Sequence, residues 1–229
     1  MLTNSRNRFV LLLSCLLLIC AAAREARAQG GQSFDISSGG QPTITGGLGA
    51  SVAGSASPLN NLAVTINFGE VSAANANSVV KVVVPVAVRS RNPYKVTVSV
   101  TGSSNVDPRA IQLTDIGFGV SNMRPLGGKA QICNSSSHLF YSPFNNDPST
   151  SFTLNASGRV AYTSDLADVG SATTILSGPK LTQGTGSSRR DDDAWVFDAV
   201  FVITPQFFAP GTASATLTFQ ISSGPNVQC

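Results

Sequence analysis

Side chains that carry catalytic or metal-binding chemistry are scarce in this sequence. It contains one histidine, four cysteines and only 12% charged residues. Two of the cysteines, Cys15 and Cys20, lie within the apolar N-terminal run Phe9–Ala23, which leaves Cys133 and Cys229 downstream. One histidine and two distant cysteines cannot supply a zinc ligand set. We therefore predict no metal site and no cofactor.

The N-terminus has the features of an export signal. Arg6 and Arg8 precede the 15-residue apolar run, and the small-x-small triplet Ala26–Ala28 is a cleavage site. The run is shorter than the ~20 residues of a membrane-spanning helix, and no later stretch is long enough to span. We expect residues 1–28 to be a signal peptide, the mature chain to lack a transmembrane segment, and the protein to reach the periplasm, the cell surface or the medium.

A lipoprotein signal is the alternative interpretation of the same segment. The residues Leu12–Cys15, LLSC, resemble a lipobox. Cleavage there would leave the apolar residues LLLIC at the start of the mature protein, so cleavage after Ala28 fits the sequence better.

Acidic and basic side chains balance once residues 1–28 are removed. The whole chain has 15 Lys+Arg and 12 Asp+Glu, and the signal takes four arginines and one glutamate, so 11 of each sign remain. A net charge of zero does not favour nucleic acid as a partner, because nucleic acids bind basic surfaces. Little electrostatic repulsion opposes association, which suits a protein that packs into assemblies.

Cys133 and Cys229 are the two cysteines of the mature chain. In an exported protein they most simply form one disulfide. It would close a loop of about 100 residues and contribute roughly 3–5 kcal/mol in the chain-entropy model. The alternative is a free C-terminal thiol that cross-links to a partner.

Alternating apolar residues predict strands from Leu62 onward. Gly69 ends the first alternating run and predicts a turn, and Pro85 places the valine-rich stretch Ser78–Ser90 at a sheet edge or a bulge, because proline lacks the donor N–H. Asn92-Pro93 is a turn signal, so Val79–Val100 is predicted to be a hairpin. The inward side chains of the first run are Leu62, Val64, Ile66 and Phe68.

Further strands are predicted along the rest of the chain. Seven to nine strands at this spacing, with few good helix formers, predict an all-β protein with one antiparallel β-sandwich over residues 59–229. Long loops are expected at Ser121–Ser157 and Gly184–Asp193. The later strands are predicted within Ile111–Val120, Ser157–Leu166, Ala172–Gly178, Ala194–Phe207, with Trp195, Phe197, Ala199, Phe201 and Ile203 inward, and Ala213–Ser222, with Ala215, Leu217, Phe219 and Ile221 inward.

The stretch Gln29–Pro58 is rich in glycine, serine and alanine and has few apolar residues. Such composition is typical of a flexible N-terminal arm. Phe34 and Ile36 nevertheless alternate in the short run SFDIS, which favours a strand that pairs elsewhere. Both interpretations remain open from the sequence.

No residue set stands out as a catalytic centre. His138 would have to be the base of any Ser/His/Asp triad, but no nucleophile-elbow glycine pattern accompanies a serine. Asp165 and Asp168 match the carboxylate pair of a glycosidase by type only. Asp191–Asp193 could offer oxygens to calcium, but Arg189 and Arg190 neutralise most of that charge. We predict no catalytic residue.

Four segments form a recognisable series, namely the turn Ile66–Gly69, the apolar strand Val79–Val88, the sequence Pro93–Val98, and the C-terminal run from Gly211 to Ile221. In these segments the chain resembles the secreted Ig-like subunits of the spore coat protein U and chaperone–usher pilin group. The resemblance implies an Ig-like, pilin-like sandwich that assembles by strand donation, in which one copy's N-terminal arm completes the sheet of another. The chain departs from the group in having no cysteine within Val84–Ser90.

These observations lead to three hypotheses of function. The first is a non-enzymatic structural or adhesive cell-surface subunit, whose partners are copies of itself or other surface subunits. The second is a module that binds a carbohydrate or another extracellular ligand through the loops, since loops on a rigid scaffold commonly carry binding functions. The third is a secreted hydrolase that uses Asp165, Asp168 or Asp191–Asp193.

Overall fold

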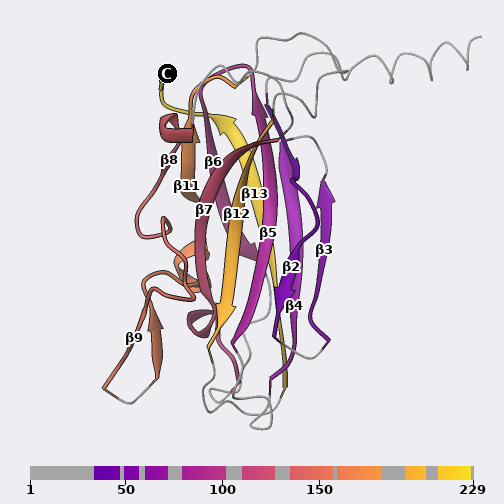
Figure 1. Ribbon diagram of the computed structural model, residues 1–229, viewed down its shortest axis with the longest axis vertical. Helices are drawn as coiled ribbons and strands as arrows, with labels where there is room; N and C mark the ends of the chain where they lie inside the picture. Colours follow the sequence, from indigo (N-terminus) through magenta and orange to yellow (C-terminus); the bar gives the residue numbers. More distant parts are fainter. Residues whose placement is uncertain are drawn as a thin grey trace, which may run out of the picture. The chain divides into compact units, whose positions relative to one another are not determined.

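Two antiparallel β-sheets packed face to face make up the computed structural model (Figure 1). The structure describes residues 34–46, 49–56, 60–71, 79–101, 110–126, 135–156, 159–181, 194–204 and 211–227. All of them belong to one of the two units into which the chain divides, 33–184 together with 189–229. The predicted signal peptide, the cysteines Cys133 and Cys229, and the charged run Arg189–Asp193 lie outside the described residues.

The first sheet has five strands in the order β1-β5-β12-β7, with β2 beside β1 on the same edge of β5. Its central strand, β12, is buried along its whole length. The strands are β1 (Phe34–Ser38), β2 (Thr43–Thr45), β5 (Val80–Ser90), β7 (Gly117–Leu126) and β12 (Ala194–Ile203).

The second sheet has six strands in the order β3-β4-β13-β6-β11-β8, and β9 and β10 form a separate two-stranded hairpin. In the described connections lie the short 3₁₀ helices η3 (Leu113–Asp115), η4 (Ser135–Ser137) and η5 (Leu166–Val169). The strands are β3 (Ser51–Ala56), β4 (Asn61–Val71), β6 (Tyr94–Thr101), β8 (Leu139–Phe140), β9 (Phe152–Leu154), β10 (Val160–Tyr162), β11 (Thr173–Gly178) and β13 (Gly211–Ser223).

The core lies between the two sheets and follows the predicted alternation. Phe197 of β12 and Phe219 of β13 meet edge to face across it, with ring centroids 6.3 Å apart. Burial of each such side chain is worth about 1.5–3 kcal/mol. The predicted inward residues of β4, β12 and β13 are all buried, namely Leu62, Val64, Ile66, Phe68, Trp195, Phe197, Ala199, Phe201, Ile203, Ala215, Leu217, Phe219 and Ile221.

The prediction of a hairpin over Val79–Val100 is wrong. β5 pairs with β1, β2 and β12, whereas β6 pairs with β11 and β13, so the connection crosses from one sheet to the other. The turn signal at Asn92-Pro93 is real, because the Ser90 hydroxyl donates to the Asn92 carbonyl there. A turn signal does not specify whether the next strand returns to the same sheet. Tyr94, at the start of β6, is fully buried in the core.

Pro85 does not lie in an edge strand, because β5 has neighbours on both sides. The Gly39 N–H donates to the Pro85 carbonyl at 2.8 Å. In an antiparallel ladder the N–H and C=O of one residue point toward the same neighbour. The Pro85 nitrogen, which carries no hydrogen, therefore points toward the interruption between β1 and β2. No strand residue there needs a hydrogen bond from it.

Gly69 lies within a strand, and the predicted turn there is wrong. β4 continues to Val71, and Phe68 and Gly69 together lie opposite Ala213 of β13, which is a β-bulge. Gly69 has φ +78°, a left-handed conformation that glycine adopts without strain. Its N–H donates to Asn67 Oδ1 at 2.9 Å, so Asn67 supports the bulge.

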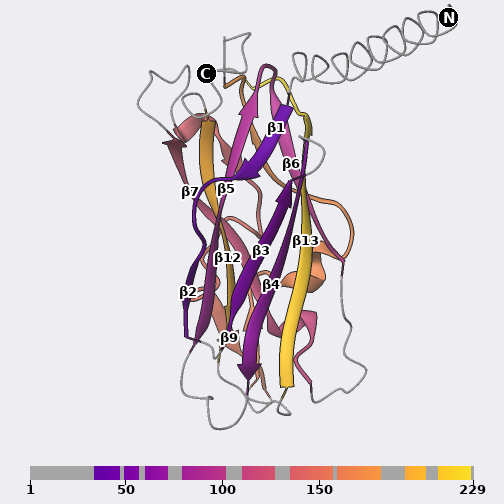
Figure 2. The same ribbon diagram turned by 90° about the vertical axis from the view of Figure 1, so that its right-hand side faces the viewer.

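The glycine- and serine-rich stretch supplies three edge strands, β1, β2 and β3, which we call the N-terminal segment. Of the two interpretations of this stretch, the paired strand is the one that the structure has at Phe34–Ser38. β1 and β2 pair with β5 of the first sheet, and β3 pairs with β4 of the second. Figure 2 looks onto this side of the two sheets.

Candidate functional site

His138 is buried between the two sheets and does not lie open to a substrate. Only 8% of the residue is exposed. Its Nδ1 lies 2.8 Å from the Tyr94 hydroxyl, and its ring centroid lies 4.7 Å from that of Trp195. Burial lowers the pKa of His138 to about 4, so the imidazole is neutral near pH 7.

The surroundings of His138 do not resemble a catalytic triad. Within the described ranges, the Tyr94 hydroxyl is the ring's one hydrogen-bond partner, and neither His138 Nε2 nor Trp195 Nε1 has one. A triad base needs a hydroxyl on one ring nitrogen and a carboxylate on the other. The geometry instead makes His138 part of a buried aromatic cluster with Tyr94 and Trp195.

Asp165 and Asp168 do come together, but around the backbone of one 3₁₀ turn. Asp165 Oδ1 accepts from the Ala167 N–H at 2.8 Å, and Asp168 Oδ2 accepts from the Asp165 N–H at 3.0 Å. The Asp168 N–H also donates to the Asp165 side chain, and this bond together with the one from the Asp165 N–H to Asp168 forms the capping box of η5. Burial and, second, the Asp168 charge raise the pKa of Asp165. Both carboxylates thus stabilise a helix start.

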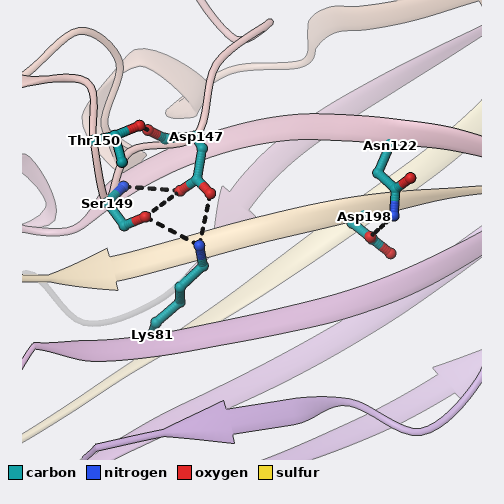
Figure 3. Close-up of polar contacts among 6 residues, drawn as sticks. All are labelled: Lys81, Asn122, Asp147, Ser149, Thr150 and Asp198. Atoms are coloured by element: carbon teal, nitrogen blue, oxygen red, sulfur yellow. Dashed lines mark hydrogen bonds and ion pairs between the residues drawn. The ribbon is translucent and has the colours of Figure 1, made fainter.

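A lysine, an aspartate and a serine, none of which the sequence pointed to, form a polar cluster on the outer face of the first sheet (Figure 3). Lys81 Nζ donates to Asp147 Oδ2 at 2.6 Å and to Ser149 Oγ at 3.0 Å. Ser149 Oγ donates in turn to Asp147 Oδ1 at 2.6 Å.

This cluster contains a serine beside a lysine, but the lysine cannot act as a base there. It pairs with Asp147, whose pKa is lowered by Lys81 and Ser149 despite the opposing effect of partial burial. A lysine base must be neutral and desolvated, whereas this ammonium is one-third exposed and opposite a carboxylate. The cluster therefore anchors the loop around Asp147 to β5.

A second unpredicted cluster surrounds Asp198, a buried carboxylate on β12 (Figure 3). Figure 3 shows the bond that Asn122 Nδ2 donates to Asp198 Oδ2 at 2.7 Å. In addition, Arg124 Nη2 lies 2.8 Å from Asp198 Oδ1. Asn122 has φ +58° and lies at a bulge of β7. The sequence could have indicated this cluster, because an aspartate lies within the apolar run AWVFDAVFV and buried charges are normally paired. The cluster fixes the bulge.

Neither the clusters nor the loops offer a metal centre in the described ranges. No group of three or more His, Cys, Asp or Glu residues there could hold a metal ion. No helix in these described ranges is long and apolar enough to cross a membrane.

Comparison with known proteins does not supply a family. No family model, curated protein or solved structure matches the chain. The function must therefore be inferred from the geometry of the chain itself.

The most distinctive arrangement is the docking of the N-terminal segment on the edges of both sheets. β1 pairs with β5 over five residues, and Ile36 projects into the core with no exposed surface. On the outer face, Arg89 Nη1 donates to Ser37 Oγ at 3.2 Å and lies 3.5 Å from Asp35 Oδ2. The edge of β5 therefore receives an extended chain through backbone pairing, the buried Ile36, the partly buried Phe34 and an ion pair, as strand-addition sites do.

The break between β1 and β2 is built into the sequence. A Cβ atom on Gly39 would lie 2.8 Å from Val196 Cγ1, so a side chain would collide there. Gly40 adopts a positive φ angle of +152°, and Pro42 precedes β2. These residues let the segment leave one strand position and enter the next.

Proposed function

We propose that this chain is an exported, non-enzymatic subunit with an Ig-like, pilin-like sandwich and a structural or adhesive role at the cell surface. Its partners are copies of itself or other surface subunits. The observation that carries the proposal is the position of the N-terminal segment, which provides an edge strand to each sheet and buries Ile36 between them.

A strand added at an edge within one chain can also be added between chains, because the backbone pairing is the same in both cases. Exchange of an identical element between copies is a low-cost route to assembly. The proposed assembly is therefore strand donation, in which the N-terminal segment of one copy docks on β5 of the next. Zero net charge of the mature chain removes one barrier to such contact.

Deletion of Gln29–Pro58 tests this proposal. The deleted chain should lose its multimers on size-exclusion chromatography, and a synthetic peptide of residues 33–56 should bind it at one peptide per chain. A peptide with Ile36→Asp is the matched control and should not bind, because a charge would enter the core. An oligomer profile that survives the deletion unchanged would refute strand donation.

A second candidate, binding of an extracellular carbohydrate or other ligand, is favoured by the β9–β10 hairpin. Leu154 and Phe152 of β9 are 67% and 37% exposed, and the Phe152 and Tyr162 rings meet edge to face at 6.2 Å. Arg159 Nη2 donates to Asp115 Oδ1 at 2.9 Å and ties the hairpin to η3. Binding on a glycan array that Phe152→Ser abolishes would support this function, and an array without binding would oppose it.

A further inference from the structure

The two open sheets have edges, and an edge strand presents a row of backbone N–H and C=O groups that can pair with another chain. Natural proteins protect such edges with short strands, charges, prolines, bulges or covering loops. In the described part of the chain the edge strands are β1 with β2, β7, β8 and β3.

Three of these four edges are protected. On β7, the Val120 N–H donates to the Phe144 carbonyl at 2.7 Å and the Phe118 N–H to the Ser164 carbonyl at 3.0 Å, so a loop covers the edge. β8 has only two residues. The edge formed by β1 and β2 is interrupted between Ser38 and Thr43 and carries the charge of Asp35.

Among the residues that the structure describes, the β3 edge carries no charge, proline or bulge. Its six residues, SVAGSA, include no charge and no proline. The pairing with β4 runs from Ser51↔Asn67 to Ala56↔Leu62 without a register shift, so no bulge turns the strand away. Ser51, Ala53 and Gly54 are exposed, and their small size lets a second backbone approach closely.

We propose that β3 is a contact between copies of this chain, in which two β3 strands pair antiparallel across a two-fold axis and join the second sheets of two molecules. An antiparallel edge is complementary to itself, because a two-fold axis brings each N–H opposite a C=O and makes the same patch serve both partners. The facing stretch of β4, Asn61–Asn67, is also uncharged, so like charges do not meet.

The contact is a weak one. A six-residue strand pair buries much less than the roughly 1,200 Å² of a stable specific interface, so we expect a reversible, concentration-dependent dimer. The inference rests on the proposed structural role of the chain but not on strand donation, because β3 keeps its place beside β4 when the contact forms.

Charge substitution at Ala53 tests the contact. In sedimentation velocity, the mature chain, residues 29–229, should show a reversible, concentration-dependent association step that is lost in Ala53→Lys and in Ala53→Glu. An equimolar mixture of the two variants should regain the dimer, because the opposite charges attract across the axis. Gln220→Lys is the matched control: it adds the same charge to the exposed face of central strand β13 and should dimerise as the wild type does.

Thermal unfolding of each variant should match the wild type, because residue 53 is exposed at a sheet edge. A wild type without this association step, an Ala53→Lys variant that keeps it, or a mixture of the two variants that does not regain it would overturn the inference. Dimers that persist in Ala53→Lys but disappear when Gln29–Pro58 is deleted would reject the β3 contact and leave strand donation in place. Hydrogen exchange provides a second readout: the amides of residues 51–56 should exchange more slowly as concentration rises.

Discussion

Ile36 of β1 lies opposite Val88 of β5 and is completely buried, although it comes from a stretch whose composition is typical of a flexible arm. Ile36 is the fully buried contact between the N-terminal segment and the core, and the partly buried Phe34 and Val52 also pack against the core. This relationship makes the segment a part of the sandwich in the isolated chain and gives the proposed strand donation its anchor.

Replacing Ile36 with alanine should lower the free energy of unfolding by about 2 kcal/mol or more, the usual cost of such a core truncation. Urea denaturation monitored by Trp195 fluorescence measures the change. Ile44→Ala, in β2 of the same segment and 36% exposed, should cost less than about 0.5 kcal/mol. Equal effects of the two substitutions would show that Ile36 is not an anchor.

Asp198→Ala should lower the free energy of unfolding by about 1–3 kcal/mol, because it leaves Asn122 without its buried acceptor and removes the ion pair with Arg124. The control is Asp147→Ala, which breaks the more exposed pair with Lys81 and should cost at most about 1 kcal/mol. Denaturant titrations measure the free energy of unfolding of both variants. A larger decrease for Asp147→Ala than for Asp198→Ala would contradict the structure.

Acid should destabilise the fold through His138. Its folded pKa of about 4 lies below the ordinary value of 6.5, so between these values the unfolded chain binds a proton that the folded chain excludes. The contribution of His138 to the free energy of unfolding is therefore fully present above pH 6.5 and decreases as the pH drops toward 4. The total loss from this group is roughly 3 kcal/mol.

The difference in stability between the wild type and His138→Phe, measured by urea denaturation from pH 7 to 4, isolates this contribution. Asp147 does not interfere, because its lowered pKa places its own loss below pH 3.8. Asp165, whose pKa is raised, contributes equally to both proteins and cancels. A difference that stays constant over this pH range would mean that the imidazole is not desolvated.

Gly69→Ala should destabilise the fold by about 1–2 kcal/mol, because alanine must adopt the left-handed conformation that the β4 bulge requires. Gly54→Ala is the control: a Cβ there meets no atom nearer than the Ala63 carbonyl oxygen at 3.9 Å. It should be neutral or slightly stabilising. The melting temperatures of the two variants measure the difference. An unchanged melting temperature in Gly69→Ala would contradict the claim that the β4 bulge requires a glycine at this position.

Strands with strong alternation could be predicted from the sequence, and their partners could not. Period-two patterns in β4, β12 and β13 identify the inward face, because burial of that face is what selects the pattern. The partner of each strand depends on contacts far along the chain, so the local signal at Asn92-Pro93 gave the turn but not the change of sheet.

The candidate sites could also be predicted only in part. His138 and the pair Asp165 and Asp168 were visible as residue types, but their roles follow from burial and from backbone donors that the sequence does not display. Lys81 and Asp198 were hidden inside apolar strands, on the face turned away from the core. The edge strand at Phe34–Ser38 had only two apolar residues to indicate it, too few to decide between arm and strand.

The most direct test of strand donation is a disulfide placed between β1 and β5. Asp35 and Arg89 lie opposite each other in the ladder, so the double variant Asp35→Cys with Arg89→Cys can be oxidised, with each single variant as control. After assembly and oxidation, non-reducing electrophoresis should show a ladder of covalently linked chains that neither single variant gives. A linked product that runs only as a monomer would mean that the N-terminal segment completes its own sandwich and donates nothing.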